Sequence, residues 1–355
     1  MRIAEVLTLS TGGIGRHVAD LAPRLVGLGH AVEVYCPSAT AAAHDLAGLE
    51  VAPLRRLHRA RGVDLLHAHG YKAGALALPY ARRWRVPLVV TWHNAVLGRG
   101  RQAVLGHLLQ RLVARGADLT LGASSDLVTE ARRCGARRAE LAPVAAPRLG
   151  PPRVPRAEHR AALGLAQDEL VVLTLGRLAP QKNLGMVLDV ARALVEEPRV
   201  AFLLAGDGPL REELAARVRR DGSRVRLLGA VADVATLLAA ADVALLTSTW
   251  EARALVAQEA LQAGLPLVST RVGGIEELVG DAAVLVEPGD DAAVVRVLRK
   301  ALAAPDRLAD LRAAGRRRAA SWPDEEQVAR SLAATFEALL RVPGAGRSTE
   351  GRPGT

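Results

Sequence analysis

Short apolar runs alternate with longer amphipathic helical patterns twice along this chain, and this alternation constrains the fold more than any other feature. In the first half the runs lie at residues 3–9, 31–35, 64–67, 88–91 and 118–121. In the second half they lie at residues 170–175, 200–205, 225–228, 243–246, 266–269 and 283–286. Strands that alternate with helices form parallel sheets with crossover helices. We therefore predict an α/β fold with two Rossmann-like, doubly wound domains that face a central cleft.

The length of 355 residues fits two such cores, because single hydrophobic cores stop growing at roughly 250 residues. The proline-dense stretch at 143–155 has no periodicity and indicates a linker, so we place the domains at residues 1–150 and 151–320. Residues 321–341 contain a further amphipathic helix. Residues 342–355 are rich in Gly, Pro and Ser and are predicted to be disordered.

The net charge of +10 lies in the first half of the chain. Residues 1–150 hold 20 Lys and Arg against 10 Asp and Glu, whereas residues 151–355 hold 27 of each. A basic face of this kind binds an anionic membrane surface or an acidic acceptor, but an Arg-rich, merely solvated surface explains it equally well. Within this half, residues 97–113 combine Arg99, Arg101 and Arg111 with apolar side chains, which is typical either of a membrane-surface helix or, more often, of a packed helix with a solvated basic side.

No stretch reaches the roughly 18 apolar residues that a membrane span requires, and the chain opens on an apolar run without a cationic leader. The two cysteines, Cys36 and Cys134, have no metal-ligand spacing. We expect a cytoplasmic protein without disulfides, peripheral at most to the inner face of the plasma membrane.

Loops that follow the strands are the expected sites of chemistry, because ligands bind outside the carboxyl ends of parallel strands. After the first predicted strand stand Gly12, Gly13 and Gly15, where backbone amides can approach a phosphate. Gly13 and Gly15 with Glu33 about 20 residues on also fit part of a dinucleotide fingerprint, although Val18 occupies the third glycine position. A nicotinamide-dependent oxidoreductase therefore stays open at this point.

Histidines follow two further strands of the first half. His67 and His69 stand after one predicted strand, and His93 with Asn94 after the next. Each histidine is as well explained by a structural role as by a functional one. We expect no zinc site, because no cysteine or carboxylate lies near them at ligand spacing.

In the second half, Arg177 and Lys182 lie on the loop after the first predicted strand, where two cations can clamp a diphosphate. Lysine is rare in this chain, with only Lys72 and Lys300 besides Lys182. Further loops carry Gly206 and Asp207, and then Glu251, with Glu259 on the helix that follows. The two glutamates can face one ligand.

Taken in order from the Gly12-Gly13 loop to the last helix, these motifs resemble the retaining glycosyltransferases of family 4. The resemblance implies the two-domain GT-B fold, with the acceptor on the first domain and the nucleotide sugar on the second. It also implies that the segment 321–341 crosses back to the first domain, with the crossing at Ser321-Trp322-Pro323. A retaining hexosyltransferase that needs neither a metal nor a cofactor is expected.

The resemblance assigns roles to individual residues. Arg177 and Lys182 would bind the donor diphosphate, and Glu259 the ribose hydroxyls. Glu251 and the amides near Ala254 and Leu255 would approach the transferred sugar. The remaining candidates are His93 at the sugar, Gly13, Gly206 and Asp207 on the donor side, and Gly12, His69 and Asn94 on the acceptor side.

One departure from the family pattern concerns the sugar site. Where the family commonly has Glu-Gly-Phe-Gly, this chain has Glu251-Ala252-Arg253-Ala254. A noncatalytic binding module derived from such an enzyme is therefore a second alternative. The expected partners are a UDP- or GDP-linked sugar, a glycan, lipid or small-molecule acceptor, and an anionic membrane, but no nucleic acid; a role in cell-envelope biosynthesis would fit.

Overall fold

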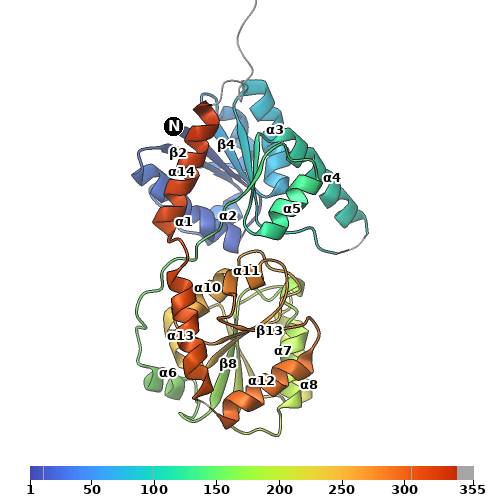
Figure 1. Ribbon diagram of the computed structural model, residues 1–355, viewed down its shortest axis with the longest axis vertical. Helices are drawn as coiled ribbons and strands as arrows, with labels where there is room; N and C mark the ends of the chain where they lie inside the picture. The colour runs from blue at the N-terminus through green and yellow to red at the C-terminus, as the bar shows by residue number, and fades with distance from the viewer. Residues whose placement is uncertain (11, 99, 305, 342–355) are drawn as a thin grey trace, which may run out of the picture. The chain divides into compact units, whose positions relative to one another are not determined.

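The computed structural model describes residues 1–10, 12–98, 100–304 and 306–341. Thr11, Arg99, Pro305 and the tail at 342–355, which was predicted to be disordered, lie outside these residues. The chain forms two compact units (Figure 1). The first unit is Met1–Ala145 together with the segment that begins at Pro323, and the second is Ala146–Trp322.

The first unit is built on a seven-stranded parallel sheet with strand order β3-β2-β1-β4-β5-β6-β7. Its strands are β1 (Arg2–Leu7), β2 (Ala31–Cys36), β3 (Glu50–Pro53), β4 (Leu65–His69), β5 (Leu88–Trp92), β6 (Leu119–Gly122) and β7 (Ala139–Leu141). Its helices are α1 (Gly13–Gly27), α2 (Ser38–Ala43), the 3-10 helix η1 (Leu54–Arg59), α3 (Tyr71–Trp84), α4 (Arg101–Gly116), α5 (Ser125–Arg133) and α14 (Glu325–Arg341). The strand order reverses between β1 and β4, which marks the crevice where such sheets bind ligands.

The second unit repeats this plan with a six-stranded parallel sheet of order β10-β9-β8-β11-β12-β13. Its strands are β8 (Leu170–Leu175), β9 (Val200–Ala205), β10 (Val225–Gly229), β11 (Val243–Leu246), β12 (Leu267–Thr270) and β13 (Val284–Val286). Its helices are α6 (Arg156–Ala162), η2 (Pro180–Lys182), α7 (Leu184–Ala193), α8 (Arg211–Asp221), α9 (Val234–Ala240), α10 (Leu255–Gln262), α11 (Ile275–Val279), α12 (Asp291–Ala303) and α13 (Arg307–Ala320). Here the order reverses between β8 and β11.

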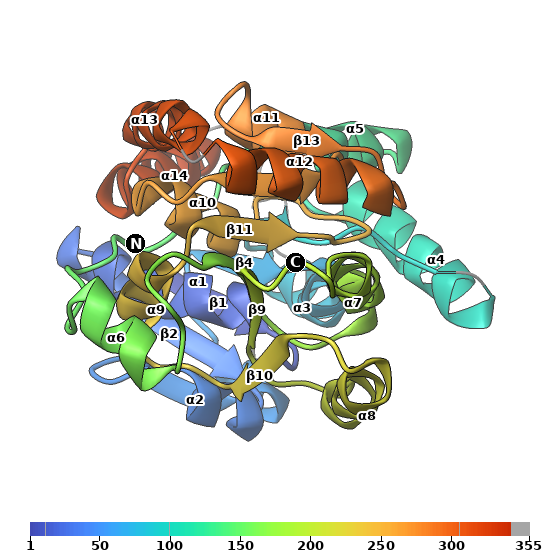
Figure 2. The same cartoon turned by 90° about the horizontal axis from the view of Figure 1, so that it is seen from below.

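Aliphatic side chains fill both faces of each sheet, as the low aromatic content requires. Helices α7, α8 and α12 cover one face of the second sheet (Figure 2), and α9, α10 and α11 cover the other. In the first unit α1 and α14 pack on the same face, where Phe336 of α14 is completely buried. The C-terminal helix thus completes the core of the first unit.

Two edge strands, β3 and β7, are not predicted from the sequence. Both are short, with four and three residues, and lie at the two edges of the first sheet. Their apolar runs are too short to stand out from loops. The third strand is predicted to end at residue 67, whereas β4 continues to His69. His67 therefore lies inside a strand.

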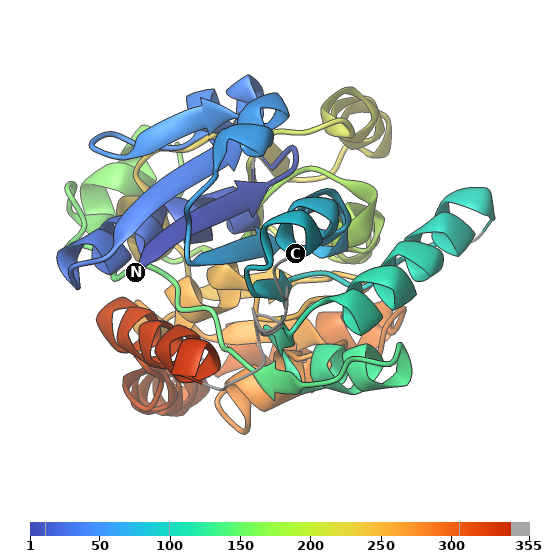
Figure 3. The ribbon, with the colours of Figure 1, turned by 90° about the horizontal axis from the view of Figure 1, so that it is seen from above.

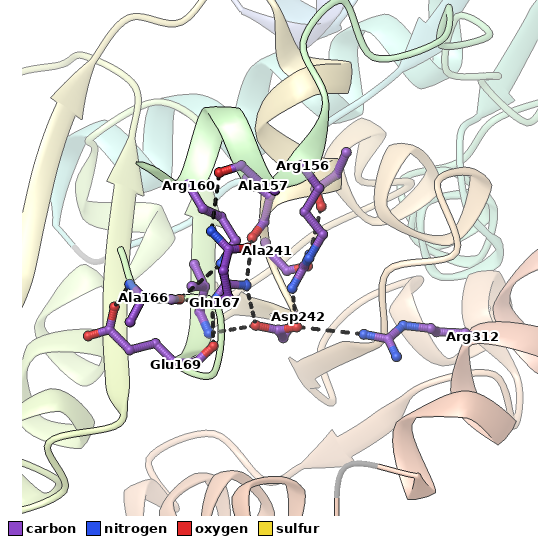
Figure 4. A network of polar contacts seen from close by, with 12 residues as sticks. Arg156, Ala157, Arg160, Ala166, Gln167, Glu169, Ala241, Asp242 and Arg312 are labelled. Carbon is purple, nitrogen blue, oxygen red and sulfur yellow. Dashed lines mark hydrogen bonds and ion pairs between the residues drawn. The ribbon is translucent and has the colours of Figure 1, made fainter. Parts of the chain in front are cut away.

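A buried ion-pair network fixes the amino-terminal ends of β8 and β11 (Figure 4). The Asp242 carboxylate accepts hydrogen bonds from the Val171 amide at 2.9 Å, from Arg160 at 3.1 Å and from Arg156 at 2.6 Å. Arg160 is fully buried and also donates to the carbonyl of Ala166 at 2.9 Å. Because these bonds compensate the buried guanidinium, the network holds the two central strands in register, at the ends remote from the loops that carry the candidate site.

Candidate active site

The loop after β8 carries the two predicted cations. Arg177 is exposed, and its guanidinium makes no hydrogen bond or ion pair with any residue that the structure describes. Lys182 closes the 3-10 helix η2, and its side chain is 20% exposed. Both side chains line a small pocket together with Gly176, Thr174 and Thr247. The pocket therefore presents positive charge at the carboxyl end of the central strand.

Lys182 is held by a carboxylate from the neighbouring loop. Its Nζ lies 2.6 Å from Oε1 of Glu251, and the Ser248 hydroxyl donates to the same oxygen at 2.7 Å. The loops are also joined through their backbones, since the Thr249 amide donates to the Gln181 carbonyl at 2.8 Å. The Gln181 side chain adds a hydrogen bond to the Trp250 carbonyl at 2.8 Å. β8 and β11 are neighbours, so the loops that follow them meet at the point where the strand order reverses.

Glycines let the next loop approach β8 closely. A side chain at Gly206 would place its Cβ 1.8 Å from the Gly176 carbonyl oxygen, and φ is +138°. Only glycine fits there. Asp207 is exposed; its Oδ1 accepts from the Gly208 amide at 2.7 Å, and its carbonyl accepts from the Leu178 amide at 2.9 Å. Asp207 thus shapes the turn beside the pocket.

Helix α10 begins at Leu255, four residues after Glu251, and with its N-cap carries the other predicted donor residues. Ala254 is its N-cap and Leu255 its first residue, and no side chain caps the amides there. Glu259 is 1% exposed on this helix. The amino end of α10 thus offers backbone N–H donors next to the loop of Glu251.

Of the three residues that depart from the family pattern, two are buried and Arg253 is partly buried. Ala252 and Ala254 are each 6% exposed, and Ala254 belongs to the hydrophobic core. The guanidinium of Arg253 lies 5.7 Å from the centre of the Trp322 ring, and burial lowers the pKa of Arg253 to about 10. These side chains are taken up by packing within the second unit.

In the first unit the histidines form one buried cluster around a glutamate that the sequence reading missed. Oε2 of Glu5 accepts a hydrogen bond from Nε2 of His69 at 2.7 Å. Nδ1 of His67 lies 2.8 Å from the same oxygen, although without hydrogen-bond geometry. Nδ1 of His69 lies 3.0 Å from Nε2 of His93. The ring of His17 lies against His69 and His93, with centroids 5.9 and 5.5 Å away.

The environment favours neutral rings at His17, His69 and His93 beside a charged Glu5 carboxylate. Burial lowers the pKa of His17 to about 3 and of His69 to about 4, and neighbouring histidines act in the same direction. Burial also holds the pKa of His93 well below its ordinary value. For Glu5 burial opposes ionisation, but the close His67 ring and the hydrogen bond from His69 outweigh it and lower the pKa of this carboxyl.

Glu5 places a carboxylate beside the histidines, so the expectation that none lies near them is wrong. Glu5, His67 and His69 bring three possible ligand atoms within 4.8 Å of one another. Two ligands of a tetrahedral zinc ion, each about 2.0–2.2 Å from the metal, stand roughly 3.3 Å apart. The separations of 2.7 and 2.8 Å at Glu5 are shorter. In this arrangement the side chains hold one another.

The other first-unit candidates lie on loops at the carboxyl ends of β1 and β5. Gly12 is the N-cap of α1 and Gly13 its first residue, and Asn94 is exposed just beyond His93. The amide of Gly15 donates to the Ser10 hydroxyl at 2.9 Å. Glu33, the ribose-binding candidate of the oxidoreductase reading, accepts instead from the hydroxyl of Tyr35 at 2.6 Å.

Comparison with known proteins decides the family. The model of the family "Glycosyl transferases group 1" matches residues 155–318, and that of the "Glycosyl transferase 4-like domain" matches residues 12–147. A glycogen synthase of Mycobacterium tuberculosis is 30% identical over 93% of this chain and 92% of its own length. The chain belongs to the glycosyl transferases group 1 family.

Other relatives of this glycosyltransferase carry different names. A D-inositol 3-phosphate glycosyltransferase of Streptomyces avermitilis is 29% identical over 82% of this chain and 76% of its own. Among solved structures, Anabaena HepE in complex with UDP-glucose superposes with a TM-score of 0.83 at 23% identity, over 96% of this chain and all of that one. WaaG, a glycosyltransferase involved in lipopolysaccharide biosynthesis, has a TM-score of 0.73 at 18% identity, over 95% of this chain and 99% of its own.

These findings confirm the predicted GT-B fold and the activity class, a glycosyltransferase. They displace the oxidoreductase reading, which rested on Gly13, Gly15 and Glu33. Among the helices that the structure describes, none is long and apolar enough to cross a membrane.

Proposed function

We propose that this glycosyltransferase transfers a hexose from a UDP-sugar to an acceptor hydroxyl with retention at the anomeric carbon, without a metal ion. The second unit binds the donor and the first unit the acceptor. The observation that carries the proposal is the pair of cations, Arg177 and Lys182, at one small pocket where the sheet order reverses. HepE, which has the same fold, was solved with UDP and with UDP-glucose.

In this proposal the diphosphate binds Arg177 and Lys182. Negative charge builds on the leaving oxygens as the bond from the anomeric carbon to the diphosphate breaks, and fixed cations stabilise this charge as it develops. Arg offers a two-pronged donor and Lys a point charge, so no metal ion is needed for this role. The acceptor oxygen attacks from the same face, and its proton passes to the departing phosphate.

The remaining contacts orient the sugar and the nucleoside. Glu259 binds the ribose hydroxyls, and Glu251 with the amides at Ala254 and Leu255 binds the transferred sugar. His93 contributes a further contact to this sugar. Gly13, Gly206 and Asp207 shape the donor loops, and Gly12 and Asn94 belong to the acceptor side. His69, the third acceptor-side candidate, is buried with its two ring nitrogens on Glu5 and His93 and supports this side from within.

The test compares the purified wild type with Lys182→Ala and with Lys300→Ala, which removes an exposed lysine from α12. UDP release from a panel of UDP- and GDP-sugars is measured with and without acceptor, and donor binding is followed by thermal stabilisation. We expect Lys182→Ala to lower kcat/KM by roughly 100-fold and Lys300→Ala to leave it unchanged. Equal rates in all three proteins would remove Lys182 from the catalytic residues. No transfer by the wild type with any donor would instead support the noncatalytic module. Thermal stabilisation by NADH but by no nucleotide sugar would contradict the proposal and support the oxidoreductase hypothesis.

We further propose that the first unit docks on an anionic membrane through α4, which projects from the sheet (Figure 3). Val104, Leu105, Leu108 and Leu112 are between 47% and 59% exposed along this helix. The same helix has three arginines and no acidic residue. An apolar stripe flanked by cations matches the boundary between lipid tails and anionic headgroups. The protein would then act peripherally at the cytoplasmic face, on a lipid-linked or cell-envelope acceptor.

A further inference from the structure

A chain of hydrogen bonds runs from the middle of β1 to the end of β5. Glu5 pairs in register with His67 of the neighbouring strand β4, and Leu7 pairs with His69. Since alternate residues of a strand share one face, both histidines stand on the side of the sheet that Glu5 occupies. Glu5 is fully buried, and His69 is 3% exposed. The carboxylate therefore has no access to solvent and acts only on its neighbours.

The donor and acceptor roles along this chain follow from the charge of Glu5. An ionised carboxylate only accepts hydrogen bonds, so Nε2 of His69, 2.7 Å away, carries the proton. A neutral imidazole has one donor and one acceptor nitrogen, which leaves Nδ1 of His69 as the acceptor. The contact of 3.0 Å to His93 then requires the proton on Nε2 of His93.

The remaining nitrogen of His93 is available to a ligand. Nδ1 has no hydrogen-bond partner among the residues that the structure describes. It is also not one of the unpartnered side-chain atoms that are completely shielded from solvent, so this nitrogen is open to an approaching ligand. With Nε2 protonated, Nδ1 holds a lone pair. Such an atom accepts a hydrogen bond from a hydroxyl and repels a carboxylate.

We propose that Glu5 and His69 are positioning residues that fix His93 as its Nε2–H tautomer, so that Nδ1 accepts a hydrogen bond from a hydroxyl of the transferred sugar. The ligand contact rests on the proposed function, which places His93 at the sugar. The tautomer does not depend on it. His67 supports the arrangement from the other side, since its Nε2 lies 2.7 Å from Oγ1 of Thr91 and its Nδ1 faces Glu5.

The direct test is the protonation pattern of the His93 ring in the ligand-free protein. Long-range ¹H–¹⁵N spectra of the uniformly ¹⁵N-labelled full chain, assigned with His93→Gln, distinguish protonated from unprotonated ring nitrogens. We expect one tautomer between pH 6 and 8, with the proton on Nε2. A proton on Nδ1, or an equal mixture of tautomers, would overturn the proposal. So would stoichiometric zinc in the purified protein, because the metal would replace the proton on His69.

Variants separate positioning from simple structural support. Glu5→Met removes the acceptor with an apolar side chain of similar length, and Glu5→Gln restores an acceptor oxygen. We expect a mixed His93 tautomer in Glu5→Met and recovery of the single tautomer in Glu5→Gln. Glu33→Met is the control. It removes a carboxylate of β2, the strand next to β1, that contacts Arg2 and Tyr35, and it should leave the His93 spectrum unchanged. A folded Glu5→Met protein with the wild-type pattern would contradict the relay.

Activity then tells the two proposals apart. With UDP-glucose as donor, Glu5→Met should lower kcat/KM at least ~10-fold, because a misplaced ring proton disables a functional histidine, and Glu5→Gln should recover most of it. If the tautomer is fixed but His93→Ala retains full transfer, the relay stands and the assignment of His93 to the sugar fails.

Discussion

The amine of Lys182 and the carboxylate of Glu251 lie 2.6 Å apart, joined across loops that follow neighbouring strands. The position of Lys182 predicts a contact to the diphosphate, and the family resemblance implies that Glu251 approaches the sugar. In the structure these two side chains contact each other. The carboxylate of Glu251 compensates the positive charge of the partly buried Lys182 amine. A diphosphate that binds Lys182 must therefore compete with Glu251 for it.

This competition gives opposite effects on binding and transfer. In Glu251→Gln the competing charge is lost, so we expect UDP to bind about 3- to 10-fold more tightly, up to the ~1.4 kcal/mol that a factor of ten represents. Transfer should fall nevertheless, because the contact to the sugar is weakened. Isothermal titration calorimetry with UDP and a rate assay with UDP-glucose measure the two effects. Weaker UDP binding in Glu251→Gln would show that Glu251 supports the diphosphate site instead of competing with it.

The sequence places Lys182 and Glu251 on loops that follow predicted strands, where ligands bind. The contact between them was not predicted, because the strand order that makes β8 and β11 neighbours leaves no local signal in the chain. The sequence did not predict the position of Glu5 either. That residue stands inside an apolar run, and only the register between β1 and β4 brings it opposite His67. Register depends on packing across the whole sheet and leaves no local signal in the chain. The same limit hid the contact of Arg253 with Trp322, which joins residues far apart in sequence.

The second prediction concerns the network at Asp242. Asp242→Ala leaves the guanidinium of Arg160, which is fully buried, without its carboxylate and removes the acceptor of the Val171 amide. We expect a loss of about 3–5 kcal/mol in the free energy of unfolding, as for other broken buried pairs. Urea titration followed by circular dichroism measures it. Glu337→Ala, which breaks an exposed pair with Arg341, is the control and should have no measurable effect. A similar change in both variants would mean that the network contributes no more than a surface pair.

The third prediction concerns pH. The pKa of His17 is about 3 in the folded protein against an ordinary value of 6.5, so below pH 6.5 the unfolded chain binds a proton that the folded chain rejects. The stability that the neutral ring allows is complete above pH 6.5 and is lost progressively as the pH falls toward 3. For this histidine alone the loss between pH 7.5 and pH 5 is about 2 kcal/mol.

His17→Phe keeps a ring in the cluster but removes this titration. We expect its stability to depend less steeply on pH than that of the wild type, when urea titrations at pH 7.5, 6 and 5 are compared. His107→Phe is the matched control, because His107 is exposed on α4, and its pH dependence should follow the wild type. If His17→Phe and wild type show the same slope, His17 is protonated in the folded protein and its proposed neutral state is wrong.

The last prediction tests the docking of α4, and it separates apolar insertion from charge. Leu105 and Leu108 are 58% and 57% exposed, so replacing both with Glu should cost the fold little while it abolishes binding to anionic vesicles at 0.1 M salt. Binding by the wild type should weaken as salt rises, because the Debye length falls from about 10 Å at 0.1 M to about 3 Å at 1 M. Val195→Glu introduces one such carboxylate at a 42% exposed position of the second unit and should bind as the wild type does. Co-sedimentation with phosphatidylglycerol-containing and with purely zwitterionic vesicles measures these differences. Equal binding by the Leu105/Leu108 variant and the wild type would exclude α4 as the docking surface, because two carboxylates within its stripe cannot enter an anionic interface without a large cost.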